Sequence, residues 1–260
     1  MAVIDTLRPE LLVSMHNSEV GGLYCYVTDT GPALGDGLAE TAVATGIPVD
    51  HGIPEEPATT LAPGVLHVPA NLTGGAMLCS TDYAGQYGTY GVMCEPPLWL
   101  DPRADDVPAV STSRADLRAR VESRRAPLRD QHRSWTERLR GRIATDTPRW
   151  RAVLAGAATL EQPWVAEQLA GSAEPTLAEA MSVLRAFDLE RVRLAGHVLA
   201  ATDDTPHRPG DPVDTVRAEA EGALAVWART SPREPFVGLD ASVAAHLGVA
   251  LSSAVALAAL

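Results

Sequence analysis

The sequence predicts an α/β domain over residues 1–108 and an α-helical region over residues 109–260. All five tyrosines, all three cysteines and 13 of the 21 glycines precede residue 100, so the chain changes character there. Short apolar runs bounded by glycine and proline, typical of buried strands, lie in the first part. Helix-capping patterns recur in the second part. A composition that is 46% hydrophobic and 21% charged is that of an ordinary folded globular chain.

The first part alternates between predicted helices and strands. A short helix over residues 3–7 ends at the Arg8-Pro9 pair, and a longer one over residues 32–45 ends at Gly46, since glycine is the usual residue after a helix. Proline cannot donate a hydrogen bond within a sheet, so Pro96-Pro97 ends the last predicted strand. Apolar runs predict three strands, over residues 11–15, 23–27 and 90–95.

Capping patterns in the second part predict a series of helices that begins near Ser113. Thr176 and Glu179 have the spacing of a capping box, in which each side chain bonds the backbone of the other. Asp211 precedes a proline that suits the first position of a helix, and Asp240 is expected to cap the last helix.

The charge of the chain is unevenly distributed. The formal net charge is −12, there is no lysine, and the segment 114–151 has twelve arginines against five acidic residues. An intermittent apolar stripe in this segment, which includes Trp135, predicts amphipathic helices whose arginines are solvated or paired. Base-stacking aromatic residues and basic loops do not accompany the arginines, so we expect no nucleic-acid partner.

The cysteines and the two ends of the sequence bear on localisation. Three cysteines do not make a disulfide framework, and the first residues do not have the pattern of a secretory signal, so we expect a cytoplasmic protein. The apolar run over residues 242–260 is mostly alanine, which contributes little transfer free energy. We therefore expect a packing helix there, and no stable membrane insertion.

Two residues at predicted strand ends are candidates for chemistry. His16 follows the strand over residues 11–15, at the edge where open α/β sheets bind ligands, and a carboxylate, Glu19, lies three residues on. Imidazole and carboxylate are zinc ligands. Glu95 ends the strand before the two prolines, and a buried carboxylate is costly without a partner or a task. The residues alone leave structural roles equally open for Glu95.

Taken together, LLVSMHNSEVGGLYCYVTDT and STDYAGQYGTYGVMCEPPLWLDPR resemble the second half of the catalytic domain of zinc carboxypeptidases, the carboxypeptidase A-like metallopeptidases. The resemblance covers roughly residues 1–105. It implies a mixed sheet in which His16 is the third zinc ligand and Glu95 activates the zinc-bound water. The family's substrate-covering tyrosine corresponds to Tyr83 or Tyr87, and Asn17, beside His16, is expected to contact the substrate.

The remaining zinc ligands can be supplied in two ways. The family's first two ligands form an H-x-x-E motif well upstream of the third. We prefer the interpretation that residues 1–105 are the back half of the domain, with that motif lying before residue 1. In the other interpretation His16 and Glu19 are themselves the pair, and His51 or His67 is the third ligand.

The resemblance implies a zinc-dependent hydrolase that cleaves a C-terminal peptide bond or an N-acyl amino acid amide. The activity is expected to be incomplete in this chain alone, which would then act as a homo-oligomer or with an upstream-encoded half. The alternative is a truncated, inactive relative that serves as a binding or regulatory module. Measured zinc that is lost on replacing His16 by alanine would favour the enzyme.

Overall fold

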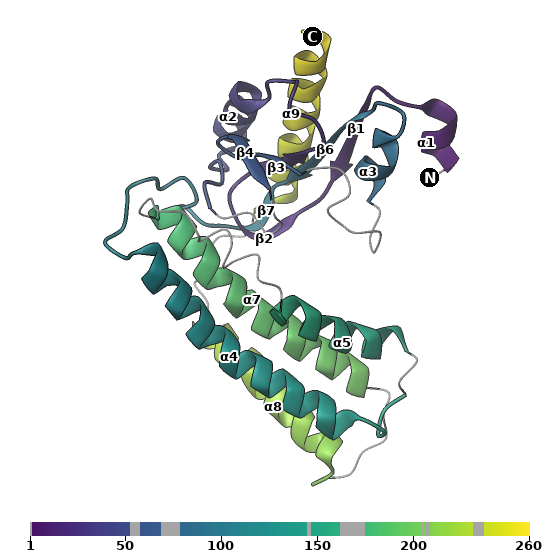
Figure 1. Cartoon of the computed structure of the whole chain (residues 1–260), viewed down its shortest axis with the longest axis vertical. Helices are drawn as coiled ribbons and strands as arrows, with labels where there is room; N and C mark the ends of the chain where they lie inside the picture. Colours follow the sequence, from purple (N-terminus) through teal and green to yellow (C-terminus); the bar gives the residue numbers. More distant parts are fainter. Residues whose placement is uncertain are drawn as a thin grey trace. The chain divides into compact units, whose positions relative to one another are not determined.

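The computed structural model describes residues 2–52, 58–68, 79–144, 147–161, 175–203, 205, 209–230 and 237–260 (Figure 1). The chain divides into two compact units, which are described separately. Unit 1 comprises Met1–Ala109, Thr176–Ser182 and Glu234–Leu260, and unit 2 comprises Val110–Pro175 and Val183–Arg233. The first change of unit lies close to the expected boundary at residue 108. The end of the chain differs, because its last helix belongs to unit 1 and not to the helical region.

Unit 1 is built on a mixed five-stranded sheet with the order β1-β6-β3-β5-β4. β1 runs parallel to β6, β6 antiparallel to β3, β3 parallel to β5, and β5 antiparallel to β4. This confirms the expected α/β class. The strands are β1 (Leu11–Met15), β3 (Tyr24–Val27), β4 (Thr59–Ala62), β5 (Val65–His67) and β6 (Tyr90–Glu95).

Helices cover both faces of this sheet. On one face, α2 (Gly35–Thr45) and α9 (Leu239–Ala258) share a core with alternate residues of the central strands, which include Cys25, Val92 and Cys94. On the other face lies α3 (Ser80–Gly85), where a Cβ added at Gly91 would lie 2.8 Å from Thr81 Cβ. A short helix, α1 (Ala2–Leu7), precedes β1.

The segments that follow His16 and Glu95 form a second, two-stranded sheet. β2 (Ser18–Gly21) pairs in parallel with β7 (Pro97–Leu100). The sequence did not predict either strand, and Pro96-Pro97 was expected to end the strand structure. Instead β6 ends at Glu95 and the chain pairs again from Pro97. Proline is tolerated at the first position of a strand, where no ladder hydrogen bond is required from it.

Most of the helix ends predicted in unit 1 agree with the observed ones. Gly46 has a φ of 70°, the left-handed conformation expected of the glycine that ends α2. Asp240 is an exception: α9 has Gly238 at its N-cap position without a side-chain cap, and Asp240 lies inside the first turn. The prediction that Asp240 caps this helix was wrong, because the N-cap position is Gly238, two residues before the aspartate.

Unit 2 is a helical bundle with an apolar core between its described helices (Figure 1). The core includes Trp135, Leu139, Leu194 and Val216, which are all fully buried. Its described helices are α4 (Arg114–Leu139), α5 (Pro148–Glu161), α7 (Leu177–Thr202), whose first turns are counted with unit 1, and α8 (Pro212–Thr230).

The caps predicted for these helices are present. The Ser113 hydroxyl accepts a hydrogen bond from the Asp116 amide at 3.0 Å. Thr176 and Glu179 form the reciprocal pair of a capping box, with hydrogen bonds of 3.1 Å and 2.8 Å, and Asp211 accepts from the Val213 amide at 2.8 Å. Each cap satisfies backbone donors that a helix start leaves without partners, which explains why α4, α7 and α8 begin near the predicted residues.

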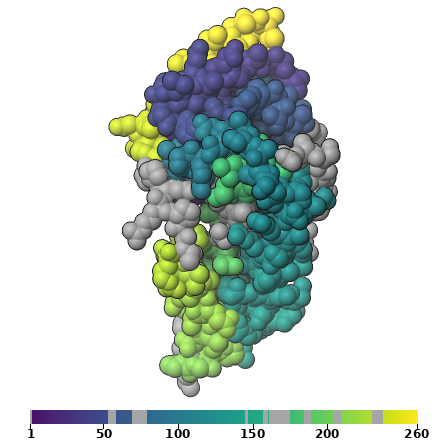
Figure 2. All heavy atoms as spheres, turned by 90° about the vertical axis from the view of Figure 1, so that its left-hand side faces the viewer, coloured from purple at the N-terminus to yellow at the C-terminus, as the bar shows by residue number. Residues whose placement is uncertain are grey.

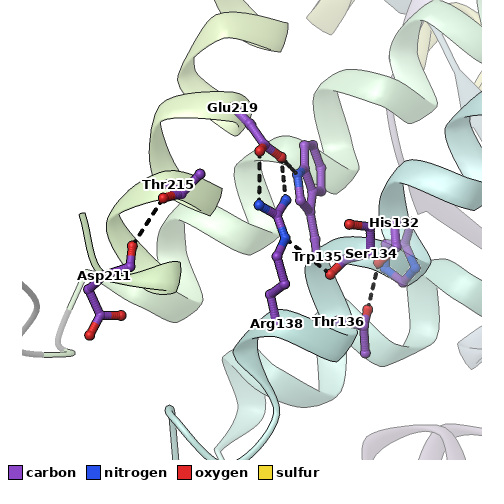
Figure 3. Close-up of polar contacts among 8 residues, drawn as sticks. All are labelled: His132, Ser134, Trp135, Thr136, Arg138, Asp211, Thr215 and Glu219. Carbon is purple, nitrogen blue, oxygen red and sulfur yellow. Dashed lines mark hydrogen bonds and ion pairs between the residues drawn. The ribbon is translucent and has the colours of Figure 1, made fainter. Parts of the chain in front are cut away.

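A polar contact joins α4 to α8 at the edge of the bundle core (Figure 3). The buried Trp135 donates its indole N–H to Glu219 at 2.8 Å, and Arg138 binds both oxygens of the same carboxylate. The Arg138 guanidinium, together with the indole N–H, lowers the pKa of Glu219. These contacts agree with the expectation that the arginine-rich segment is amphipathic, with some of its arginines paired to acidic residues.

Two histidines lie inside the bundle. His132 Nε2 is 2.7 Å from the Val153 carbonyl oxygen, and His197 bonds the Ala152 backbone. Burial lowers the pKa of His132, and the neighbouring His197 lowers it further, against the opposing hydrogen bond to Val153. Burial and the nearby Arg193 lower the pKa of His197. The folded bundle therefore favours the neutral form of both imidazoles.

We expect unit 2 to lose stability as the pH falls below about 6.5, the ordinary pKa of histidine. Because the folded pKa values of His132 and His197 are lowered, the unfolded chain binds more protons below that pH, and protonation favours unfolding. The melting temperature, followed by circular dichroism at 222 nm, should fall by several degrees between pH 7.5 and pH 5.5, at about 2–4 °C per kcal/mol.

The matched variants are His132→Gln, which keeps a donor for the Val153 carbonyl but does not titrate, and His51→Gln in unit 1 as the control. His132→Gln should flatten the pH dependence of the melting temperature, while His51→Gln should leave it unchanged. An equally steep dependence in His132→Gln and in a His197→Gln variant would contradict this assignment.

Candidate functional site

The parallel pairing of β1 with β6 brings His16 and Glu95 together. Met15 is in register with Cys94, and the His16 amide donates to the Cys94 carbonyl at 3.0 Å, so the ladder continues one residue past β1. His16 Nδ1 lies 3.1 Å from Glu95 Oε1. The imidazole is 60% exposed, whereas the carboxylate is only 6% exposed. A buried carboxylate thus holds an accessible histidine at the carboxyl ends of two parallel strands.

The contact determines which ring nitrogen is available. A carboxylate can only accept hydrogen bonds, so the imidazole donates from Nδ1 to Glu95. In the neutral imidazole Nε2 then has the lone pair, and no hydrogen bond to Nε2 is found among the residues that the structure describes. This is the arrangement in which a carboxylate fixes the tautomer of a histidine that acts as a base at Nε2.

A third residue, Tyr24, lies beside the pair and was missed by the sequence reasoning. Tyr24 is directly opposite Glu95 in the antiparallel β3–β6 pair, and side chains of opposite residues project from the same face, about 5 Å apart at Cβ. Its ring packs edge-on against Tyr26 at 5.4 Å between centroids. His16, Glu95 and Tyr24 therefore form a row across three strands. The sequence feature that could have indicated this residue is the pair Tyr24 and Tyr26, at alternate positions of one predicted strand.

The turn that contains His16 is held by α9. His246 Nε2 is 2.8 Å from the His16 carbonyl oxygen, and His246 Nδ1 is 2.9 Å from the Ser242 carbonyl oxygen. Asn17 donates to the Pro96 carbonyl at 3.0 Å and to the Ser242 hydroxyl at 3.3 Å. Asn17, predicted to contact the substrate, thus ties the two strand ends to α9, and His246, left unassigned by the sequence, supports the backbone of His16.

The structure does not bring the other predicted residues to this row. Glu19 lies within β2, two residues beyond the turn, and the carboxylate that His16 contacts is Glu95. Tyr83 and Tyr87 donate their phenolic hydrogens to Asp5 of α1, at 2.5 Å and 2.8 Å.

Because Asp5 precedes β1 and His16 follows it, this tyrosine cluster lies at the opposite end of the strand. The hydrogen bonds from Tyr83 and Tyr87 lower the pKa of Asp5 and raise the pKa values of both phenols. Such paired phenols have a structural explanation, since they join α3 and the following turn to α1.

The two histidines considered as a third zinc ligand, His51 and His67, lie on other segments of unit 1. His67 is in register with Val27 on β5, at the end of β3 away from Tyr24 and hence from Glu95. The His51 amide donates to the Ala104 carbonyl in a loop. His207 lies outside the described residues. The registers of β3 with β5 and β6 therefore place His67 away from Glu95 and His16.

A catalytic zinc ion needs three protein ligands and one open position. In the part of the chain that the structure describes, no group of three or more histidine, cysteine, aspartate or glutamate side chains is arranged to hold a metal. His16 and Glu95 are a pair, and their nearest polar atoms face each other at hydrogen-bond distance. Two ligands are fewer than the three that a catalytic zinc ion requires, and we derive no step through the metal.

The cysteines on this sheet are structural. Cys25 and Cys94 are opposite each other on β3 and β6, fully buried on the face that α2 and α9 cover. Burial raises the pKa of the Cys25 thiol well above its ordinary range and that of Cys94 to about 12. Thiols of this kind are poor nucleophiles at neutral pH, which agrees with the expectation of buried, unreactive cysteines.

No family model, curated protein or solved structure matches this chain. The chemistry of the site therefore rests on the geometry of His16, Glu95 and Tyr24. An oriented, accessible imidazole can take a proton from water or a hydroxyl and return it to a leaving group.

Proposed function

We propose that the chain is a hydrolase in which His16 is the general base and Glu95 is the residue that positions it. The observation that supports this is the contact of 3.1 Å between an exposed imidazole and a buried carboxylate at the ends of β1 and β6. The role of Glu95 differs from the one implied by the resemblance, because this carboxylate faces the imidazole and is shielded from solvent. The exposed group of the pair is the one that can reach a substrate.

In the proposed reaction Nε2 of His16 takes a proton from a water molecule as its oxygen attacks the scissile carbonyl carbon. The imidazolium that forms is stabilised by the Glu95 carboxylate on Nδ1. The same proton then passes from Nε2 to the leaving nitrogen as the bond from carbon to nitrogen breaks, which returns the imidazole to its neutral form. Tyr24, opposite Glu95, lies at the other end of the row from His16.

The substrate class follows from the resemblance to zinc carboxypeptidases alone: a peptide bond next to a free C-terminus, or an N-acyl amino acid amide. Zinc as a cofactor is supported only by the same resemblance. The two proposals can be separated experimentally, because a zinc ligand and a general base respond differently when His16 is replaced.

The experiment is a hydrolysis assay on a set of N-acyl amino acids and short peptides, with the metal content of each preparation measured by plasma mass spectrometry. His16→Ala and His16→Gln should lower kcat/KM by about 100-fold or more, the usual contribution of a positioned base. His51→Ala is the matched control and should keep full activity. Unchanged turnover in His16→Ala would overturn the proposed base, and one zinc per chain that this variant loses would instead assign His16 as a ligand.

A further inference from the structure

The exposed surface of α9 carries large apolar side chains from its first residues to its last turn. Five large side chains recur at every fourth residue and have between 46% and 75% of their surface exposed. We call them the α9 ridge: Leu239, Val243, Leu247, Leu251 and Val255. From Ala241 to the end of the helix, this face carries no charged residue, and the positions beside the ridge are alanines such as Ala244 and Ala254.

The opposite face of α9 packs against α2 and the rest of unit 1. A Cβ added at Gly248 would lie 2.6 Å from Thr41, and one added at Gly37 would lie 2.4 Å from Ser252, so α2 and α9 approach closely through glycines. His246 is also engaged on that side, with the His16 carbonyl. Figure 2, which looks onto the violet residues that include α2, shows the yellow ends of α9 at the surface to either side.

We propose that the α9 ridge is a dimer interface, in which a second copy of this chain packs its own α9 ridge across the first. The exposed area of the five side chains is on the order of 600 Å² per chain, which is as large as the largest apolar patch of a typical monomer. Two copies together expose about 1,200 Å² on these side chains, which equals the lower bound of the area that a stable interface buries.

The charge distribution favours a second copy. The chain has a formal net charge of −12, which opposes self-association through most of its surface. The α9 ridge, with no charged residue from Ala241 onward, is a face through which two such chains can approach without placing like charges in contact. Its small flanking alanines leave grooves between the large side chains, and a ridge of residues four apart fits into the same grooves of an identical helix.

A membrane is a poorer occupant of the same face. By length and composition α9 could cross a bilayer, with a mean hydropathy of 1.7 over its most apolar window. Spanning would separate α9 from α2 and remove His246 from the His16 carbonyl. Helices that lie on membranes usually combine an apolar face with a lysine- and arginine-rich one, whereas α9 has no basic residue apart from His246.

The four-residue spacing of the α9 ridge also predicts how the two α9 helices cross. Ridges of residues four apart pack with the helix axes crossed at about 50°, so contact is closest at the centre of the ridge and is lost toward its ends. In a two-fold symmetric pair the central residue faces its own copy. Leu247 is that central residue, and Leu239, eight positions away, lies about 12 Å along the helix from the crossing point.

The first test is the mass of the full chain by sedimentation velocity and light scattering at micromolar concentrations. The wild-type chain should be a dimer, and the double variant Leu247→Glu with Leu251→Glu should be a monomer with an unchanged circular dichroism spectrum. Val107→Glu is the matched control, since Val107 is a comparably exposed apolar residue in a loop of unit 1. A monomeric wild-type chain, or a dimer that survives the double variant, would overturn the proposal.

The second test is disulfide cross-linking, which does not depend on the tolerance of the fold for charges. Leu247→Cys should form a linked dimer on mild oxidation, and Leu239→Cys should link at least tenfold less. Equal linking at both positions would contradict the crossed arrangement. Co-sedimentation of the wild-type chain with phosphatidylcholine vesicles, together with loss of the dimer, would show that a membrane is the occupant and would also overturn the proposal.

Discussion

Replacing Glu95 by glutamine is expected to lower kcat/KM by about 100- to 10,000-fold, the range for a carboxylate that orients a catalytic histidine. Glutamine has the size of glutamate, so the packing at the end of β6 is retained. It differs in that its amide group donates as well as accepts hydrogen bonds. The Nδ1 position of His16 then no longer faces an obligatory acceptor, and Nε2 is no longer reserved as the base.

Three measurements make this result specific. The ¹⁵N chemical shifts of His16 should report the tautomer with a proton on Nδ1 in the wild-type chain, and a mixture or the other tautomer in Glu95→Gln. The double variant His16→Ala with Glu95→Gln should lose no more activity than His16→Ala alone, because residues that act as a unit are not additive. Glu19→Gln, the matched control, should keep both activity and tautomer. Full activity in Glu95→Gln would refute the proposed mechanism.

Replacing Trp135 by alanine should have the largest effect on stability, a loss of about 3–5 kcal/mol in the free energy of unfolding of unit 2. Trp135 is fully buried in the bundle core, and its indole is one of the two groups that bind Glu219. The substitution opens a cavity that cannot close without moving α4, and it removes a donor from a carboxylate that Arg138 must then hold alone (Figure 3).

Urea unfolding followed at 222 nm measures this effect. Trp135→Phe separates its two parts, because it keeps most of the ring and loses the N–H donor, with an expected loss of about 1–2 kcal/mol. The matched control is Leu154→Ala, a large-to-small change at an exposed position of α5, which should change stability by less than about 0.5 kcal/mol. A loss in Trp135→Ala no larger than in Leu154→Ala would contradict the burial of this side chain.

The sequence by itself determined the local structure of the chain. The strands at residues 11–15 and 90–95 were predicted at their observed bounds, and the caps at Ser113, Thr176 and Asp211 are present. Apolar periodicity and capping act over a few residues, so the information lies within each segment. The elements it missed include β2 and β7, short strands whose pairing depends on a distant partner, and also β4, β5 and the short helix α3.

The candidate site shows the same division. The sequence indicated His16 and Glu95 separately, each at a strand end, but assigned His16 to a zinc ion and paired it with Glu19. The contact between His16 and Glu95 arises from the parallel register of β1 with β6, and Tyr24 joins them through the antiparallel register of β3. Register between strands far apart in sequence is set by the whole sheet and by the helices that cover it.

For the last helix, α9, only the tertiary structure shows which part of the chain it packs against. Residues 242–260 have the composition of a helix, but nothing in that composition says that α9 packs against α2. Gly37 and Gly248 allow α2 and α9 to approach, and His246 reaches the His16 carbonyl. Close approach of backbones and a hydrogen bond across the fold exist only once the elements are assembled, because both depend on surfaces that no single segment contains.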